Sequence, residues 1–190
     1  SRLVCLVRVS TRNRCPGCRA CIPLRIDAET LVPTKSQRRS IKKNEDITLT
    51  FAPASFERED YELFTAYQAS RHPDESNQLT ETDYFSAYIR SPVPNALIRY
   101  RTPGGALAAV SYLDILPNGL SSVYFAFHPD FSSRSLGTWS VFAESNFLRS
   151  LGKRWYYLGF WVPGSPTMDY KDRFRPHETA ENGIWQAATL

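Results

Sequence analysis

The most constraining feature of the sequence is a series of short apolar segments between Asn95 and Val162, separated by turns that contain glycine. Segments 96–101, 106–116 and 120–128 are rich in aliphatic, β-branched and aromatic residues. The turns that join them read PGG and PNG. Short β-type runs connected by turns of this kind predict three strands of an antiparallel meander.

The segments after this meander change in character. Residues 134–150 predict a helix that ends before Gly152, and the strongly apolar run 155–162 predicts a further strand. A short helix is expected near 167–174. The order strand-strand-strand-helix-strand-helix is typical of the α+β class, in which helices pack on a mixed, mostly antiparallel sheet.

Two helices are predicted ahead of the meander. Ser55 is suited to cap the first helix, and Pro73 prevents its continuation. Thr80 with Asp83 resembles a capping box that opens a second helix through Arg90. The residues at helical spacing that predict the inner faces are Phe56, Leu63, Phe64 and Tyr67 in the first helix and Phe85, Tyr88 and Ile89 in the second.

The charge is unevenly distributed along the chain. Residues 1–43 hold eleven Lys and Arg against two acidic residues, whereas residues 44–190 hold twelve against seventeen, so a net of +9 faces a net of −5. We therefore expect a basic N-terminal segment over residues 1–50 and a C-terminal domain over 51–190. A basic end favours a polyanionic partner; surface charge that serves only solubility is the less favoured alternative, because such charge would be scattered along the chain.

The composition excludes several classes of protein. No stretch approaches the roughly 20 apolar residues that cross a bilayer, and the start SRLVCLVRVS does not have the pattern of a secretory signal. This start also lacks an initiator Met, so we expect the chain to be a fragment of a longer protein. With 13% aromatic residues, most of the chain is not disordered. Clustered rather than distributed cysteines fit a cytoplasmic location.

Three of the four cysteines have a spacing that metal sites use. Cys15, Cys18 and Cys21 follow the pattern C-x2-C-x2-C, whose thiolates can converge on one ion. A tetrahedral zinc site or an iron–sulfur cluster requires a fourth ligand, and Cys5 is the only other thiol. Metal binding and a set of buried thiols both remain open.

The start of the predicted helix 134–150 carries a recognisable signature. Arg134, Gly137 and Trp139 follow the order R-x-x-G-x-G/A of the GNAT acetyltransferase fold, which the pattern resembles. In that fold the backbone amides at a helix N-terminus bind the cofactor pyrophosphate. Because Trp139 replaces a small residue, the sequence supports the fold rather than the coenzyme A cofactor.

Two further segments carry clustered polar groups. Lys35, Ser36-Gln37-Arg38-Arg39 and Lys42-Lys43 form a basic run that suits contact with phosphates, with a solvated charged face as the alternative. The segment 157–176, YLGFWVPGSPTMDYKDRFRP, places acidic, phenolic and basic side chains directly after an apolar strand. Ionisable groups at the exit of a strand are typical of the rim of an active site.

Taken together, these segments resemble the aminoacyl-tRNA–protein transferases, in particular the bacterial aspartate/glutamate leucyltransferases. The resemblance rests on CPGCRACIPLRI followed by SQRR, then on YQASRHPD, SLGTWSVF and YLGFWVPGSPTMDYKDRFRP, which cover residues 15–176 in the family's order. SRLVCLVRVSTRNR matches the family poorly, in the place where a further Cys-Pro segment is normal, so we expect an N-terminally truncated member.

The resemblance implies a fold, an activity and partners. It implies a GNAT-like acyltransferase fold that moves leucine, or less favoured arginine, from charged tRNA to the α-amino group of proteins that begin with Asp or Glu. This addition marks the acceptor for N-degron degradation. The resemblance implies no required cofactor; an iron–sulfur cluster or zinc at Cys15, Cys18 and Cys21 is the possible exception. Neither substrate involves a membrane.

Site residues follow from these motifs. An aminoacyl ester is already activated, so the enzyme mainly has to juxtapose it with a neutral amine. We predict Asp169 as the general base, Tyr170 as a donor to the oxyanion, and Lys171 as a ligand of the 3′ phosphate or of the acceptor's acidic side chain. Asp169 as a helix cap is the alternative. The predicted substrate-binding residues are Arg38, Arg39, Tyr124, Arg173 and Arg175.

Other functions compete with this interpretation. His72 and His128 both precede proline and are interpreted as turn residues, so nucleophilic catalysis through a Ser–His or Cys–His pair is disfavoured. A CoA-dependent GNAT acetyltransferase, a non-catalytic tRNA- or degron-binding remnant, and a redox sensor built on the clustered thiols remain as alternatives. The sequence does not decide between leucine and arginine as the transferred residue.

Overall fold

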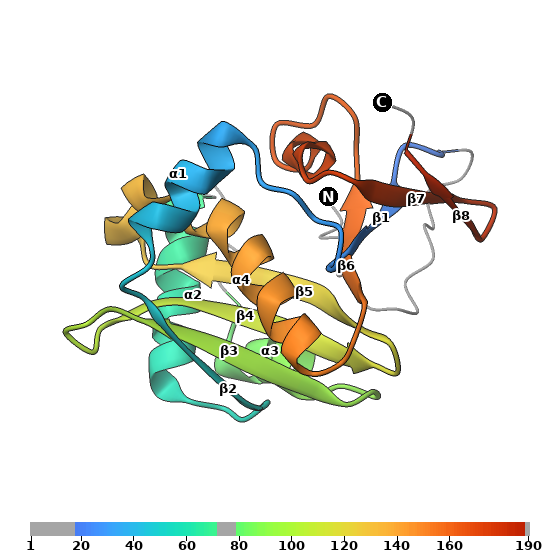
Figure 1. The fold of residues 1–190 in the computed structure, drawn as a ribbon. Coiled ribbons are helices and arrows are strands. Elements are labelled where there is room, and N and C mark those ends of the chain that lie inside the picture. The colour runs from blue at the N-terminus through green and yellow to red at the C-terminus, as the bar shows by residue number, and fades with distance from the viewer. Residues whose placement is uncertain (1–17, 72–78, 189–190) are drawn as a thin grey trace.

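The computed structural model describes residues 18–71 and 79–188, whose strands all belong to one eight-stranded sheet (Figure 1). Their order is β2-β3-β4-β5-β6-β1-β7-β8, and every pair is antiparallel except β5 with β6. The strands are β1 (Ile22–Asp27), β2 (Thr48–Pro53), β3 (Asn95–Arg101), β4 (Leu107–Leu116), β5 (Gly119–Phe127), β6 (Trp155–Trp161), β7 (His177–Glu181) and β8 (Ile184–Ala187).

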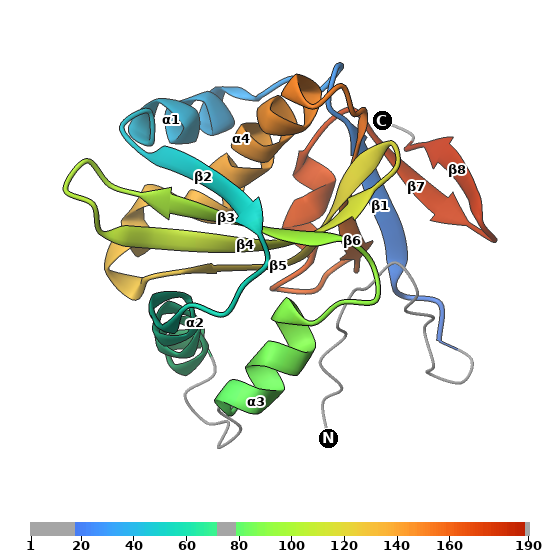
Figure 2. The ribbon, with the colours of Figure 1, turned by 90° about the horizontal axis from the view of Figure 1, so that it is seen from below.

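Helices cover both faces of this sheet. The α-helices are α1 (Lys35–Lys43), α2 (Arg58–Arg71), α3 (Glu81–Tyr84) and α4 (Leu136–Ser150). Figure 2 shows α1 and α4 on one face and α2 and α3 on the other. Short helical turns, η1 (Phe85–Ile89), η2 (Pro129–Arg134) and η3 (Asp169–Arg173), complete the described elements. None of these helices is long and apolar enough to span a bilayer.

The parallel pair β5/β6 is short, and the two strands then separate. Pairing extends only from Gly119 with Trp155 to Ser121 with Tyr157, after which β6 turns away from β5 (Figure 1). Gly119 allows the close approach, because a Cβ there would lie 2.1 Å from the carbonyl oxygen of Trp155. The segment after β6 therefore leaves the sheet at the divergence of the two strands.

A carboxyl group lies inside the core on the α4 side of the sheet. Glu144 in α4 is buried and accepts hydrogen bonds from the hydroxyls of Tyr100 on β3, Ser111 on β4 and Tyr156 on β6. Burial raises the pKa of Glu144, and the three hydroxyl donors oppose that shift only in part. This network ties α4 to the consecutive strands β3 and β4 and to β6, which follows α4 in sequence.

The central part of the predicted fold is confirmed. The strands expected at 96–101, 106–116, 120–128 and 155–162 are β3, β4, β5 and β6, and the helix expected over 134–150 is α4. The first helix of the pair ahead of the meander is α2, and the short helix near 167–174 is the 3₁₀ turn η3. The predicted α+β class, with helices on a mostly antiparallel sheet, is therefore present.

One predicted inner face is wrong in part. Tyr88 and Ile89 are buried as expected, but Phe85 is 42% exposed and Tyr84 is buried in its place. The second helix changes from α3 to the wider π-helical turn η1, in which the amide of Arg90 donates to the carbonyl of Phe85. Tyr84 and Tyr88, four residues apart, set the face that packs on the sheet.

The basic N-terminal part is built into the same sheet as the rest. β1 lies between β6 and β7, and β2 forms one edge. The boundary expected between residues 50 and 51 falls inside β2. Leu24 and Ile26 of β1 are buried in the core, which explains their alternation with polar neighbours. Residues 22–53 therefore share the sheet with the C-terminal part.

Candidate functional site

A pocket of about 660 Å³ lies where three segments from distant parts of the sequence meet. One wall is the start of α1, the second is the N-terminus of α4, and the third is η3 with the residues that follow it. Its lining residues are Thr34, Ser36, Gln37, Ser40, Ser135, Thr138, Tyr170, Asp172, Arg173, Phe174 and Arg175. The pocket thus joins the SQRR block to the block that ends in MDYKDRFRP.

The α1 wall begins at a capping box. Thr34 accepts from the backbone amide of Gln37, and the side chain of Gln37 accepts from the amide of Thr34 at 2.8 Å. The helix ends in Lys42 and Lys43, which suit the negative end of its dipole. This local chemistry explains why a segment with few apolar residues forms a helix here.

The α4 wall begins at a residue in a left-handed conformation. Ser135 has φ 55°, and its carbonyl accepts from the amides of Thr138 and Trp139. Arg134, the arginine of the GNAT-like signature, donates to Asn44 and pairs with Asp46, so its guanidinium holds α1 and the loop after it. Its charge is therefore used within the fold.

Trp139 lies in the core, outside the pocket. It is 6% exposed, and its ring makes an edge contact with Tyr100 at 5.5 Å. Trp139 stands where the GNAT signature has a small residue, but its side chain packs on Tyr100 of the sheet and does not line the pocket. A Cβ on Gly137 would also meet Phe125 only at an ordinary 3.8 Å.

In the third wall, Tyr170 lines the pocket and two of its predicted partners do not. Asp169 accepts a hydrogen bond from the indole N–H of Trp161 at 3.1 Å. Lys171 donates through Nζ to the carbonyl oxygen of Phe160 at 2.8 Å. Both contacts fasten η3 to the end of β6.

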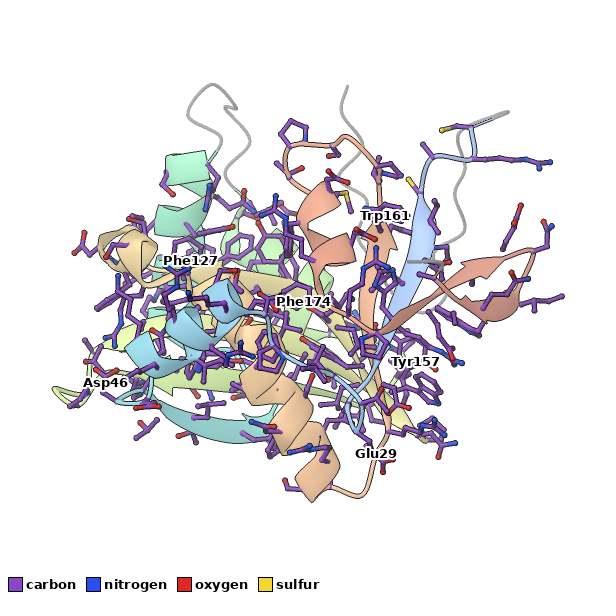
Figure 3. All side chains as sticks on the ribbon, turned by 45° about the horizontal axis from the view of Figure 1, so that its top comes forward. Glu29, Asp46, Phe127, Tyr157, Trp161 and Phe174 are labelled. Carbon is purple, nitrogen blue, oxygen red and sulfur yellow. The ribbon has the colours of Figure 1, made fainter. Side chains whose placement is uncertain are left out.

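The phenol of Tyr170 is held in its protonated form. Although 41% of the residue is exposed, the surrounding protein desolvates the hydroxyl and raises the pKa of Tyr170 to about 12. The negative charges of Tyr67, when ionised, and of Glu144 act in the same direction. Its ring packs edge-on against Phe174 at 6.2 Å, and Phe174, labelled in Figure 3, lies 5.8 Å from Phe142 of α4. Tyr170 is therefore a neutral hydrogen-bond donor at neutral pH.

The end of this wall carries positively and negatively charged side chains. Arg173 is exposed, and Arg175 donates to Asp172 at 2.7 Å. Behind them lies His177, whose side chain is buried and whose Nδ1 lies 2.9 Å from the carbonyl oxygen of Phe174. Its Nε2, without a hydrogen-bond partner, is 3.6 Å from Asp172. Desolvation lowers the pKa of His177.

The remaining predicted residues lie at different distances from this pocket. Arg38 and Arg39 are exposed on α1, beside the lining residues Ser36 and Gln37, and Arg38 also donates to the carbonyl of Pro33 at 2.6 Å. Tyr124 lies on the α2 side of the sheet, where its hydroxyl accepts from Gln68 at 2.9 Å. Tyr124 is therefore not part of the pocket.

The predicted metal ligands are only partly within the described residues. Cys18 is exposed, Cys21 is half-buried, and neither is in a disulfide, whereas Cys15 lies outside the described residues. Over residues 18–71 and 79–188, no three Cys, His, Asp or Glu side chains are grouped as a metal site requires. The metal site stays a prediction. His72 also lies outside the described residues, and His128 caps η2 as a turn residue should.

Several lining residues were not predicted from the sequence. No individual role was predicted for Gln37, Ser40, Ser135, Thr138 and Asp172, although all of them except Ser40 lie within the sequence blocks that carry the resemblance. The spacing of Gln37, Ser40 and Asn44 is helical, and it is the one sequence signal that places three polar residues on one face of α1.

The sequence is similar to known proteins over most of its length. Residues 59–181 match the family model described as Arginine-tRNA-protein transferase, C terminus. An aspartate/glutamate leucyltransferase of Gluconobacter oxydans is 38% identical over 172 residues, which cover 90% of this chain and 72% of the relative. One of Azorhizobium caulinodans is 38% identical over 189 residues, with 94% and 76% covered.

Solved structures share the fold at much lower identity. The structure of L-PGS from Bacillus licheniformis has a TM-score of 0.58 at 11% identity and covers 88% of this chain and 58% of its own. With the strand order and the β5/β6 divergence, this confirms the expected GNAT-like arrangement.

Proposed function

The chain belongs to the arginine-tRNA-protein transferase family, and from this premise we propose that it transfers leucine from leucyl-tRNA to the α-amino group of proteins that begin with Asp or Glu. The relatives named aspartate/glutamate leucyltransferase support leucine as the transferred residue. The product would carry a new N-terminal leucine, which marks it for N-degron degradation.

The observation that carries this proposal is the pocket between α1, α4 and η3. Its volume of about 660 Å³ is in the range of roughly 300–1,000 Å³ that small-molecule sites occupy. We assign it to the aminoacylated 3′ end of the tRNA. Tyr170 offers aromatic surface, Arg173 offers charge, and the first amides of α4 favour an anion. Arg38 and Arg39 on α1 would contact phosphates further along the acceptor strand.

The reaction requires little covalent chemistry from the protein. The acceptor amine attacks the ester carbonyl carbon, a C–N bond forms, and the bond from that carbon to the ribose 3′ oxygen breaks. The amine loses a proton and the ribose oxygen gains one. Because an α-amino group titrates near ~7.7–8.0, a fraction is already neutral at pH 7. Orientation in the pocket supplies most of the acceleration.

Tyr170 is the proposed oxyanion donor. It lines the pocket, and its raised pKa of about 12 keeps the O–H in place at neutral pH. A single well-placed donor of this kind is worth about 10²-fold or more in rate. Asp169 as base and Lys171 as phosphate ligand stay predictions: each would act only by exchanging its contact to Trp161 or Phe160 for one to substrate.

Transfer of labelled amino acid tests the proposal directly. Leucyl-tRNA or arginyl-tRNA is incubated with the chain and with peptides that begin with Asp, Glu or Ala. We expect label on the Asp and Glu peptides from leucyl-tRNA only. Arginine transfer instead would change the donor, and absence of transfer with retained tRNA binding would favour the non-catalytic remnant. Tyr170→Phe serves as the site variant, with Tyr157→Phe as its matched control, because Tyr157 of β6 is half-buried and does not line the pocket.

Coenzyme A is the alternative donor that the fold allows. Acetyl-CoA is expected to leave the melting temperature unchanged, since Arg134 is held by Asn44 and Asp46 rather than presented to a pyrophosphate. A rise of several degrees with acetyl-CoA would favour the acetyltransferase instead.

A further inference from the structure

The helix α1 is docked on the rest of the protein mainly through polar side chains, with the half-buried Ile41 as the apolar residue of the helix that packs on the core. Gln37 and Ser40 are buried, with 5% and 8% of their surface exposed, and Asn44 at the C-cap is fully buried. Their spacing of three and four residues places them on one face of the helix. Helices normally dock through an apolar stripe, whereas these three residues are polar. We call Gln37, Ser40 and Asn44 the polar seam.

Each residue of the polar seam bonds to a backbone carbonyl near the pocket. Gln37 donates through Nε2 to the carbonyl of Arg173 at 3.0 Å, and Ser40 donates to the carbonyl of Ser135 at 3.2 Å. Asn44 donates to the carbonyl of Arg134 at 2.9 Å and accepts from the side chain of Arg134 at 3.0 Å. The seam therefore connects α1 both to η3 and to the start of α4.

The outward side of the same helix is basic. Lys35, Arg38, Arg39, Lys42 and Lys43 are all exposed. Lys43 also donates to the carbonyl of Ser133 at 2.7 Å, so its ammonium group lies against η2, directly before α4. One nine-residue helix thus presents cations to solvent and, through its opposite face, supports the pocket.

We propose that Gln37, Ser40 and Asn44 are positioning residues that couple tRNA phosphate contacts on α1 to the geometry of the pocket. The inference rests on the proposed function of that pocket. Hydrogen bonds are directional, so the three bonds to Arg134, Ser135 and Arg173 fix the rotation and height of α1, whereas an apolar stripe would tolerate sliding. Phosphates bound by the basic face and the ester bound in the pocket are then held in one register.

Gln37→Glu removes a hydrogen bond of the polar seam while it keeps the capping box that stabilises the helix. The carboxylate still accepts from the amide of Thr34, so the capping box is retained, but it has no hydrogen to donate to Arg173. Ser40→Ala removes the bond to Ser135 without a change of charge. Gln186→Glu on the exposed edge strand β8 is the matched control for added negative charge.

The measurement is leucine transfer from leucyl-tRNA at several salt concentrations, together with binding of uncharged tRNA. We expect Gln37→Glu and Ser40→Ala to lower kcat/KM by about tenfold, the loss of one bond, and Gln186→Glu to have no effect. Melting temperatures within a few degrees of the wild type would show that the variants fold. Should Gln37→Glu not fold, Ser40→Ala carries the test by itself.

A combined variant provides the readout that a merely structural role would not move. Arg39→Gln should reduce the salt slope of tRNA binding by roughly 0.7–0.9 in the wild type, as one phosphate contact does. In the Gln37→Glu background we expect the same change to have less than half that effect. Equal effects in both backgrounds, or wild-type kcat/KM in both seam variants, would overturn the inference. Absence of transfer by the wild type would instead refute the proposed function.

Discussion

Replacement of Glu144 by alanine is the sharpest test of the core. The carboxyl accepts hydrogen bonds from Tyr100, Ser111 and Tyr156, which are all buried, so its removal leaves three buried hydroxyls without their acceptor. Tyr100 and Ser111 lie 3.1 Å apart and can satisfy one donor between them. Two donors remain, each at a cost of about 1–3 kcal/mol.

The expected loss is therefore about 4 kcal/mol of a total that is typically ~5–15 kcal/mol. With a urea m-value of about 2 kcal/mol per M, the unfolding midpoint should fall by about 2 M. Tyr156→Phe removes one donor and leaves the carboxyl with two, so about 1–2 kcal/mol is expected. Glu144→Gln keeps an acceptor while the hydroxyls rotate, and it should cost less than either change.

The pH dependence of stability in Glu144→Gln, compared with the wild type, provides a second and independent test. Because burial raises the native pKa of Glu144 above its ordinary value of 4.5, there is a pH interval above 4.5 in which the native carboxyl still binds a proton and the unfolded chain has released it. Wild-type stability from this group is then present below pH 4.5 and falls as pH rises toward the native pKa. Glutamine does not titrate, so the variant should gain on the wild type over that range. A Glu144→Ala midpoint equal to wild type, or a gain of the opposite sign, would refute the reasoning.

Three further predictions follow from single contacts. Gly119→Ala should destabilise the protein by about 3 kcal/mol, because its Cβ meets the Trp155 carbonyl, whereas Gly137→Ala should be neutral or stabilising; urea midpoints compare the two. Tyr170→Phe should lower kcat about 100-fold with little change in KM for leucyl-tRNA, and an unchanged kcat would remove its oxyanion role. Burial and Arg175 lower the native pKa of His177, while Asp172 opposes the shift, so stability should fall as pH drops below 6.5, and His177→Asn should flatten that slope where His128→Asn does not.

The sequence predicted those elements whose signals are local. β3, β4 and β5 are joined by turns with glycine, and β6 is a continuous apolar run, so neighbouring residues were enough to locate them. β1 is different, because its partners β6 and β7 follow it by more than a hundred residues and only tertiary pairing reveals it. The hairpin β7–β8 did carry a usable signal: Asn182-Gly183, both at positive φ, forms its turn.

The candidate site was predictable in its chemistry but not in its assembly. The strand exit at 157–176 pointed to the segment whose Tyr170, Arg173 and Arg175 line the pocket, while their role there stays a prediction. Nothing in local spacing reveals that Asp169 and Lys171, two neighbours of Tyr170, bond back to β6. Gln37 was not predicted as a docking residue because α1 has Ile41 as its single apolar residue, which is too little for the hydrophobic pattern that usually identifies a docking face.

The position of β1 makes the basic N-terminal part inseparable from the site. Among the described strands, β7 pairs with β1 and β8 alone, so a chain that starts at residue 51 loses the strand that joins the β7–β8 hairpin to the sheet. An isolated two-stranded hairpin is marginal in water. The shorter chain also lacks Leu24 and Ile26 of β1, which are buried in the core. We expect residues 51–190 to lack a cooperative urea transition and tRNA binding alike, whereas residues 18–190 should keep the transition. A sharp transition in the shorter chain would mean that the C-terminal part holds its fold without β1. In that case tRNA contact, assigned here to α1, could be measured as a separate function of the first 50 residues.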